Sequence, residues 1–394
     1  MSSKPNIKNF SRIYRYLQDP DLRTRETGDA LLTIEGAEFS GLNLQGLVWR
    51  HVKFVNCDFA GAYEIKLDRL EKSTFENCKF VGIHGFGDMV DVTLHRCAFD
   101  GETYVMGYSD SKRLVFDDCN FVGTDSNRNH WGAVGGYGEA EFVRCKGKWF
   151  DLSGLTQLVI RDCEFETVSS KHDPREVANV HAPVLIERSK LRGTFNMVAS
   201  SIQSLTIRDT VIDALDLTDT TIKGEVTMER VRAGKLGMAV ASGQALALKA
   251  VIVTGNGQEV FYLSANRFAS ALLENCVLPD NLSGEKPWMG GAQKEPAYQA
   301  RPPLNKNLTI RKSKASRLDA SYLNTAHLVL DGSEFNHLDL SYGRIGLMEM
   351  NNTQIGFSLD LTHCQVNDFK QTGGTSLKSL GGLKLDGSNI NLPQ

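Results

Sequence analysis

The sequence predicts an all-β protein: a parallel β-helix solenoid with coils of about 20 residues and a short helical cap at its N-terminus. Two patterns lead to this prediction, apolar residues that recur every five positions and cysteines that recur about once per coil. A period of five fits neither an α-helix nor a flat strand, but residues i−2 and i share one face of an extended chain. Short straight segments joined by corners satisfy the pattern, and four segments close one coil.

The clearest run of fives lies between residues 34 and 60. Its large members are Ile34, Phe39, Leu44, Trp49, Phe54 and Phe59, and the residues two positions before them are Leu32, Ala37, Leu42, Leu47, Val52 and Cys57. Both sets are expected to point into the coil. The same spacing returns between residues 205 and 238 and between residues 308 and 355.

Several of these fives carry an acidic or amide residue between the two inward positions. Examples are Ala37-Glu-Phe39, Leu42-Asn-Leu44, Cys57-Asp-Phe59, Leu215-Asp-Leu217 and Leu338-Asp-Leu340. This register resembles the pentapeptide-repeat proteins, here in a degenerate form with insertions. The resemblance implies a right-handed, four-sided parallel β-helix. It implies no single activity, because the family is a scaffold that serves several functions.

Residues 1–30 differ from the rest of the chain. Phe10, Ile13, Tyr14 and Leu17 have the spacing of a short amphipathic helix that ends before Asp19 and Pro20. A bare sheet edge invites pairing with another chain, so we expect this helix to cover the first coil.

The remaining residues are expected to form one continuous solenoid domain. Residues 31–278 form a β-helix with per-coil insertions, residues 279–305 form a long loop rich in Pro and Gly, and residues 306–394 form the C-terminal coils. A hinge at this loop between two solenoid halves is the alternative. The insertions fall at one phase of the coil and should project from one side: 61–73, 81–91, 100–113, 122–139, 147–157 and 166–183.

The cysteines occupy the small inward slot of successive coils. Six of them step along the N-terminal half and predict a structural ladder inside one face: Cys57, Cys78, Cys97, Cys119, Cys145 and Cys163. Other coils place Ser189, Thr210, Ser333 or Thr353 in this slot, so small size explains the choice. The spacing of zinc ligands is missing, and we expect packed free thiols and no metal site.

Composition limits the partner classes. The chain of 394 residues has a formal net charge of −3, which favours neither direct nucleic-acid binding nor mimicry of DNA. There is no secretory signal and no apolar run long enough to span a membrane. We therefore expect a cytoplasmic protein that has no membrane partner and needs no cofactor.

Catalytic patterns are weak. Asp117, Asp118, Asp162, Glu164, Asp209 and Asp216 lie at outward positions and could in principle serve a carbohydrate-active β-helix enzyme. Arginines recur beside them in successive coils, which is typical of a solvated charge ladder. We predict no catalytic residue and therefore no enzyme.

Aromatic residues outside the repeat slots are better candidates, because Trp and Tyr are common interface anchors. The predicted partner-binding residues lie in the insertions and the long loop: Phe86, His130, Trp131, Tyr137, Trp149 and Trp288. The alternative is that these side chains fold back against corners of the coil.

We consider three functions. The first is a non-catalytic interaction protein that binds and neutralises a protein partner; the resemblance implies its most concrete form, an immunity or antitoxin-like protein against a bacterial toxin enzyme. The second, drawn from the resemblance, is a DNA-mimicking protein that binds gyrase or another topoisomerase. The third is a secreted effector or a carbohydrate-active β-helix enzyme. The C-terminal edge also offers a surface for a homodimer.

Overall fold

The computed structural model describes residues 4–28, 30–42, 45–60, 67–81, 87–100, 107–122, 136–151, 155–169, 183–198, 200–238, 241–255, 261–262, 267–279, 305–374 and 381–390. It confirms the predicted fold class, an all-β parallel solenoid with coils about 21 residues apart. The chain forms two compact units, Met1–Gly193 (unit 1) and Thr194–Gln394 (unit 2).

Each unit contains two parallel sheets, which we call sheet 1 and sheet 2. In unit 1, sheet 1 contains β1 (Leu32–Glu35), β2 (Val48–Arg50), β3 (Val52–Val55), β4 (Arg69–Glu76), β6 (Asp88–His95), β8 (Gly107–Asp117), β10 (Gly136–Val143), β12 (Leu155–Arg161) and β14 (Pro183–Glu187). Sheet 2 contains β5 (Lys79–Val81), β7 (Ala98–Asp100), β9 (Asn120–Val122), β11 (Lys146–Asp151) and β13 (Glu164–Ser169), and β15 (Lys190–Asn196) begins in this unit.

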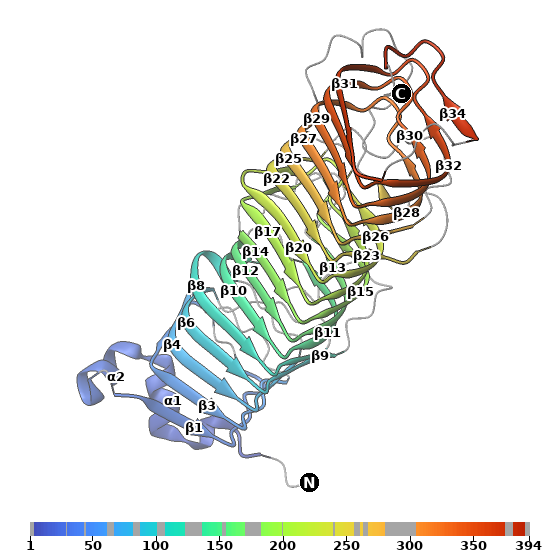
Figure 1. Cartoon of the computed structure of the whole chain (residues 1–394). Coiled ribbons are helices and arrows are strands. Elements are labelled where there is room, and N and C mark those ends of the chain that lie inside the picture. Colours follow the sequence, from blue (N-terminus) through green and yellow to red (C-terminus); the bar gives the residue numbers. More distant parts are fainter. Residues whose placement is uncertain are drawn as a thin grey trace. The chain divides into compact units, whose positions relative to one another are not determined.

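In unit 2, sheet 1 contains β16 (Ser201–Ile202), β17 (Ser204–Arg208), β19 (Thr221–Ile222), β20 (Glu225–Glu229), β22 (Ser242–Lys249), β25 (Arg267–Glu274), β27 (Asn305–Arg311), β29 (Asn324–Asp331), β31 (Arg344–Asn351) and β33 (Gln365–Thr372). Sheet 2 contains β18 (Val211–Asp216), β21 (Arg232–Gly237), β23 (Ile252–Val253), β24 (Phe261–Tyr262), β26 (Val277–Leu278), β28 (Lys314–Asp319), β30 (Glu334–Asp339), β32 (Gln354–Asp360) and β34 (Gly382–Lys384). Successive strands of each sheet lie side by side (Figure 1).

Residues of successive coils stack directly on one another. In unit 1, Phe54 pairs in register with Phe75, and their rings stack at 4.8 Å. Phe59, Phe80 and Phe99 form a second stack, with centroid distances of 5.0 and 4.9 Å. Phe54 and Phe59 belong to the predicted inward set, and the rings stacked on them are buried as well, so the inward positions of the fives mark the core of this unit.

The small inward slot in each coil follows a residue with a left-handed backbone. In unit 1 these corner residues are Asn56, Asn77, Arg96, Asp118, Arg144, Asp162 and Arg188, all with φ between 48° and 55°. The corner turns the chain from sheet 1 into sheet 2. Asn and Asp tolerate this conformation better than most residues, and four of the seven corners use them.

The predicted N-terminal helix is present as α1 (Ser11–Gln18), preceded by a short 3₁₀ turn, Ile7–Asn9. A second helix that the sequence did not predict, α2 (Pro20–Thr27), follows directly, with the Asp19 side chain accepting a hydrogen bond from the Leu22 N–H at its N-terminus. Both helices contact the first coils. At α1, the Leu17 carbonyl accepts the indole N–H of Trp49 at 3.1 Å, and at α2, Arg23 donates to the His51 carbonyl at 2.9 Å.

Candidate binding surface

Most of the aromatic residues predicted to bind a partner lie outside the described residues. This holds for Phe86, His130, Trp131 and Trp288. The backbones of Tyr137 and Trp149 lie in strands β10 and β11, and their side chains are outside the described set. The surface that these residues would form stays a prediction, and the described residues offer other candidates.

The six cysteines of unit 1 lie at consecutive rungs. The backbone carbonyl of each cysteine accepts a hydrogen bond from the N–H of the residue that follows the cysteine of the next coil. The donors and acceptors are Lys79 to Cys57, Ala98 to Cys78, Asn120 to Cys97, Lys146 to Cys119 and Glu164 to Cys145. The thiols also contact backbone carbonyls, as in Cys119 Sγ to the Leu94 oxygen at 3.2 Å. All eight cysteines are buried free thiols.

Hydroxyl side chains make the same contact elsewhere. In unit 2, Ser333 Oγ donates to the Ile310 carbonyl at 3.1 Å and Thr353 Oγ1 donates to the Leu330 carbonyl at 2.9 Å. A small side chain with a hydrogen-bond donor satisfies this contact in most of these coils, which accounts for Cys, Ser and Thr together, while Val231 and Val251 fill the same slot without a donor. Within the described residues, no group of three or more His, Cys, Asp or Glu side chains is arranged to hold a metal ion.

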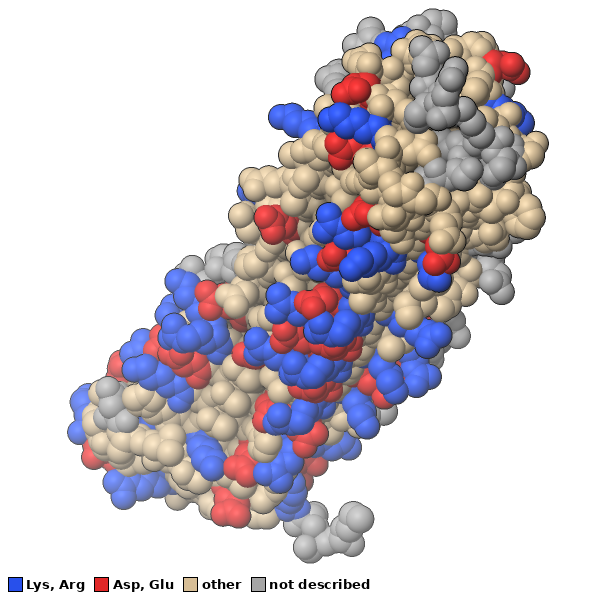
Figure 2. Space-filling model, viewed as in Figure 1, with Lys and Arg blue, Asp and Glu red and all other residues tan. Residues whose placement is uncertain are grey.

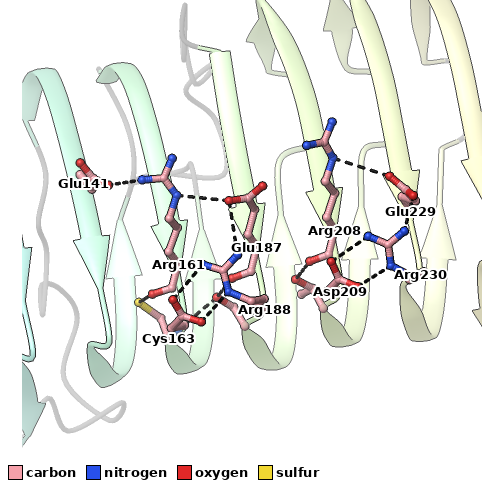
Figure 3. Close-up of polar contacts among 12 residues, drawn as sticks. Glu141, Arg161, Cys163, Glu187, Arg188, Arg208, Asp209, Glu229 and Arg230 are labelled. Carbon is pink, nitrogen blue, oxygen red and sulfur yellow. Dashed lines mark hydrogen bonds and ion pairs between the residues drawn. The ribbon is translucent and has the colours of Figure 1, made fainter.

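A band of charged side chains covers the outer surface near the ends of the sheet 1 strands (Figure 2). In unit 1, Arg161 lies between two carboxylates, Glu141 on β10 and Glu187 on β14, at 3.2 Å from the latter (Figure 3). Arg188 forms a bidentate ion pair with Asp162, with N–O distances of 2.8 and 3.0 Å. In unit 2, Arg230 pairs with Asp209 in the same way, at 2.6 and 2.9 Å.

The carboxylates weighed for catalysis belong to this band. The Arg188 guanidinium lowers the pKa of Asp162, and Arg192, at 2.7 Å, lowers the pKa of Glu164. Asp216 instead accepts the Thr218 N–H at 3.0 Å at a corner. A general acid needs a raised pKa, so Asp162 and Glu164 are poorly suited to that role.

One His and Asp pair resembles a catalytic dyad. His95 Nδ1 lies 2.9 Å from Asp117 Oδ2, but Arg96 Nε donates to His95 Nε2 at 2.7 Å. Arginine is always a donor, so Nε2 must be the accepting nitrogen and Nδ1 must carry the proton. The nitrogen that a general base would use, Nε2, therefore already accepts the hydrogen bond from Arg96. The pair belongs to the charged band.

Exposed apolar side chains gather on unit 2. Among the described residues, the large exposed hydrophobic side chains are Leu31 in unit 1 and Val211, Ile252, Val277, Tyr342 and Phe357 in unit 2. Val211, Ile252 and Val277, which we call the apolar rungs, occupy one row on the outer face of sheet 2. The corresponding row in unit 1 is mostly polar: Asp58, Lys79, Ala98, Asn120, Lys146 and Glu164.

The row of apolar rungs leads into a groove of about 400 Å³ on β26, β28, β30 and β32. Lys314, Glu334 and Gln354 continue the row along the groove, and Ser316, Asn336 and Gly356 form the next row. Lys314 and Glu334 form an ion pair at 2.7 Å. The groove therefore combines polar side chains with apolar walls from Val277 and Ile355.

An aromatic stack lies at the opposite corner of the same coils. The rings of Tyr322 and Tyr342 stack at 5.0 Å with an interplanar angle of 8°, and His363 continues the stack at 5.0 Å from Tyr342. All three residues have left-handed backbones, with φ between 54° and 61°. The corner thus fixes a short column of rings at the surface, and Tyr342 is 47% exposed.

The fold and these surfaces define the chain as a parallel β-solenoid with a charged band and, on unit 2, a row that carries three exposed apolar side chains. No family model, curated protein or solved structure matches the chain. None of the helices in the described residues is both long and apolar enough to cross a membrane.

Proposed function

We propose that this chain is a non-catalytic interaction protein that binds a protein partner through the outer face of sheet 2 in unit 2. The observation that carries the proposal is the row of apolar rungs, Val211, Ile252 and Val277, on a face whose equivalent in unit 1 is mostly polar. Their exposed fractions are 43%, 38% and 45%. Exposed apolar side chains that gather on one face are typical of protein interaction sites.

The rigid coil supports this function. Neighbouring rungs are held in register by backbone hydrogen bonds, as where Ile252 pairs with Val277. Side chains on such a scaffold lose little conformational entropy when a partner binds. Arg232 lies between Val211 and Ile252 and adds a charge that a partner carboxylate can pair with.

A finer version of the proposal has three parts: membership of the pentapeptide-repeat family, a cytoplasmic location, and an immunity or antitoxin-like role in which the bound partner is a toxin enzyme. The Leu-Asp-Leu and Leu-Asp-Ala corners of unit 2 support the first part, because Asp216, Asp319 and Asp339 each accept a backbone N–H two residues on. The buried free thiols support the second, since a reducing compartment keeps cysteines unpaired. The third rests on the docking face alone.

The test uses a photo-cross-linking amino acid at position 252, in the full chain and in its native host. A partner identified this way is purified and its affinity for the full chain is measured. Ile252→Glu should weaken that affinity by about tenfold or more, because it places a charge at a desolvated contact. Leu31→Glu, at an exposed apolar position in unit 1, is the control.

Equal binding by the Ile252→Glu and Leu31→Glu variants would show that the partner uses another surface. If the partner is a toxin enzyme, the wild-type chain should also abolish its activity in a purified assay, and the Ile252→Glu variant should not.

A further inference from the structure

The groove on unit 2 carries hydrogen-bonding groups that the fold does not use. Ser316, Asn336 and Gln354 line it, and none of the three makes a side-chain hydrogen bond to another residue in the described parts of the chain. The two charged residues at its rim, Lys314 and Glu334, neutralise each other at 2.7 Å. The groove therefore offers amide and hydroxyl groups without a net charge.

A β-bulge presents an aromatic ring beside these groups. Phe335 pairs with Ile355 and His337 pairs with Ser358, so Asn336 on β30 faces both Gly356 and Phe357 on β32. Bulges redirect a side chain, and here Phe357 is 64% exposed. Single exposed rings are common on protein surfaces, and this one is accessible to a ligand in the groove.

The orientation of Phe357 is fixed on one side and open on the other. Its ring stacks on His337 at a centroid distance of 5.5 Å, and His337 Nδ1 lies 2.8 Å from Ser358 Oγ. On the next coil Gly382 pairs with Ser358, so the neighbour of this serine has no side chain. Gly356 lines the groove and directly precedes Phe357 in β32, so the ring lies at the border of the groove.

We propose that this groove binds a neutral oligosaccharide. Sugar rings have an apolar C–H face that packs on an aromatic ring, and hydroxyl groups that pair with amide and hydroxyl side chains. In this arrangement one sugar packs against Phe357 while its neighbours bond to Asn336, Gln354 and Ser316. Sites of this mixed kind fix a ligand through a few polar groups on an otherwise apolar wall.

Charge and spacing favour this ligand class over others. A phosphate or carboxylate ligand needs an unpaired cation, and the lysine in the groove is already paired with Glu334. A fully apolar ligand would leave the three polar side chains without partners. Successive rungs lie about 4.8 Å apart, which is close to the length of one sugar unit in an extended glycan.

The experiment titrates the full-length chain with four tetrasaccharides, from cellulose, starch, chitin and xylan, and measures affinity by calorimetry. At least one should bind at millimolar concentration or below. Asn336→Ala and Phe357→Ala should each weaken that binding by about tenfold. The matched controls are Asn367→Ala, an exposed asparagine on β33, and Leu31→Ala, and both should bind as the wild type does.

Absence of binding to all four tetrasaccharides would overturn the proposal, and so would equal binding by the groove variants and their controls. The groove shares Val277 with the protein-docking face, but Ile252 does not line it, so Ile252→Glu should leave saccharide binding unchanged. Loss of one activity without the other therefore identifies which proposal has failed. Circular dichroism of each variant checks that its fold is retained.

Discussion

Arg23 of helix α2 donates a hydrogen bond of 2.9 Å to the carbonyl oxygen of His51, at the left-handed corner between β2 and β3. The same guanidinium donates to the Arg50 carbonyl and, at 2.8 Å, to the Ala30 carbonyl. The arginine is almost fully buried, at 8% exposure. One side chain of the cap thus serves three backbone groups of the first coils.

Replacing this side chain should destabilise the cap strongly. Arg23→Met keeps the apolar stem but leaves three carbonyls without their donor, and we expect a loss of about 2 to 4 kcal/mol in the free energy of unfolding. Chemical denaturation measures this value. Arg25→Met, at an exposed position of the same helix, is the control, and an equal loss in both variants would contradict the role given to Arg23.

The cysteine rungs predict a fall in stability at alkaline pH. Burial raises the pKa of Cys97 and of Cys276, and it raises the pKa of Cys364 to about 12. An unfolded cysteine has a pKa near 8.5 and releases its proton above that value, while the folded thiol keeps it. The unfolded state then binds fewer protons, so the free energy of unfolding decreases as pH rises above about 8.5.

The measurement compares the midpoint of urea denaturation between pH 8 and pH 10 for the wild type and for Cys276→Ser. Serine fits the slot, because Ser313 and Ser333 occupy the same rung position in the following coils. The variant should fold, and its midpoint should depend less on pH than that of the wild type. An unchanged slope would show that this thiol does not contribute.

Asp319 should be replaceable by asparagine with a gain in stability at neutral pH. Its carboxylate accepts the Ser321 N–H at 3.1 Å, an interaction that an amide oxygen can also make. Burial raises the pKa of Asp319, so the charged form is disfavoured in the folded state. That unfavourable contribution is absent at acid pH, where the aspartate is protonated, and grows as pH rises.

Thermal unfolding at pH 4 and pH 7 tests this expectation. The stabilisation of Asp319→Asn relative to the wild type should be larger at pH 7 than at pH 4. Asp339→Asn, at the same corner of the next coil but less buried, should give a smaller difference. The opposite order of the two pH values would contradict the burial argument.

Asn389 takes the place of a further strand beside β33. Its side-chain oxygen accepts the Val366 N–H at 2.7 Å, and its side-chain nitrogen donates to the Val366 carbonyl at 2.9 Å. Asn389→Leu removes both contacts and exposes one donor and one acceptor on a sheet edge. We expect faster self-association, measured by light scattering, and a loss of about 1 to 3 kcal/mol. Asn367→Leu, an exposed position on β33, is the control.

The sequence was sufficient to predict the core, because burial repeats with the coil. Phe54, Phe59 and Trp49 stood in the predicted inward set, and all three are buried. Helix α2 was not predicted because its polar surface, Pro20 to Thr27, shows no amphipathic period; its anchor is a buried arginine, and arginine normally indicates exposure.

The groove and the apolar rungs could not be read from the spacing alone. Val211, Ile252 and Val277 stand one position after the small inward slot, but only the strand pairing brings three distant residues into one row. Phe357 differs from the expected register because the bulge adds one residue to β32. Several stretches counted as insertions also begin the next strand, as where β4 starts at Arg69.

The donor in the small slot has a consequence for how such a chain can change in length. Thr353 bonds to a carbonyl of the previous coil in the same way that Ser333 does, so these two successive coils make the same attachment. If a stretch of one coil, such as residues 323–342, were duplicated or deleted, the strands on either side of the change would still pair in register. Gene duplication could therefore lengthen or shorten this protein without redesigning its interior.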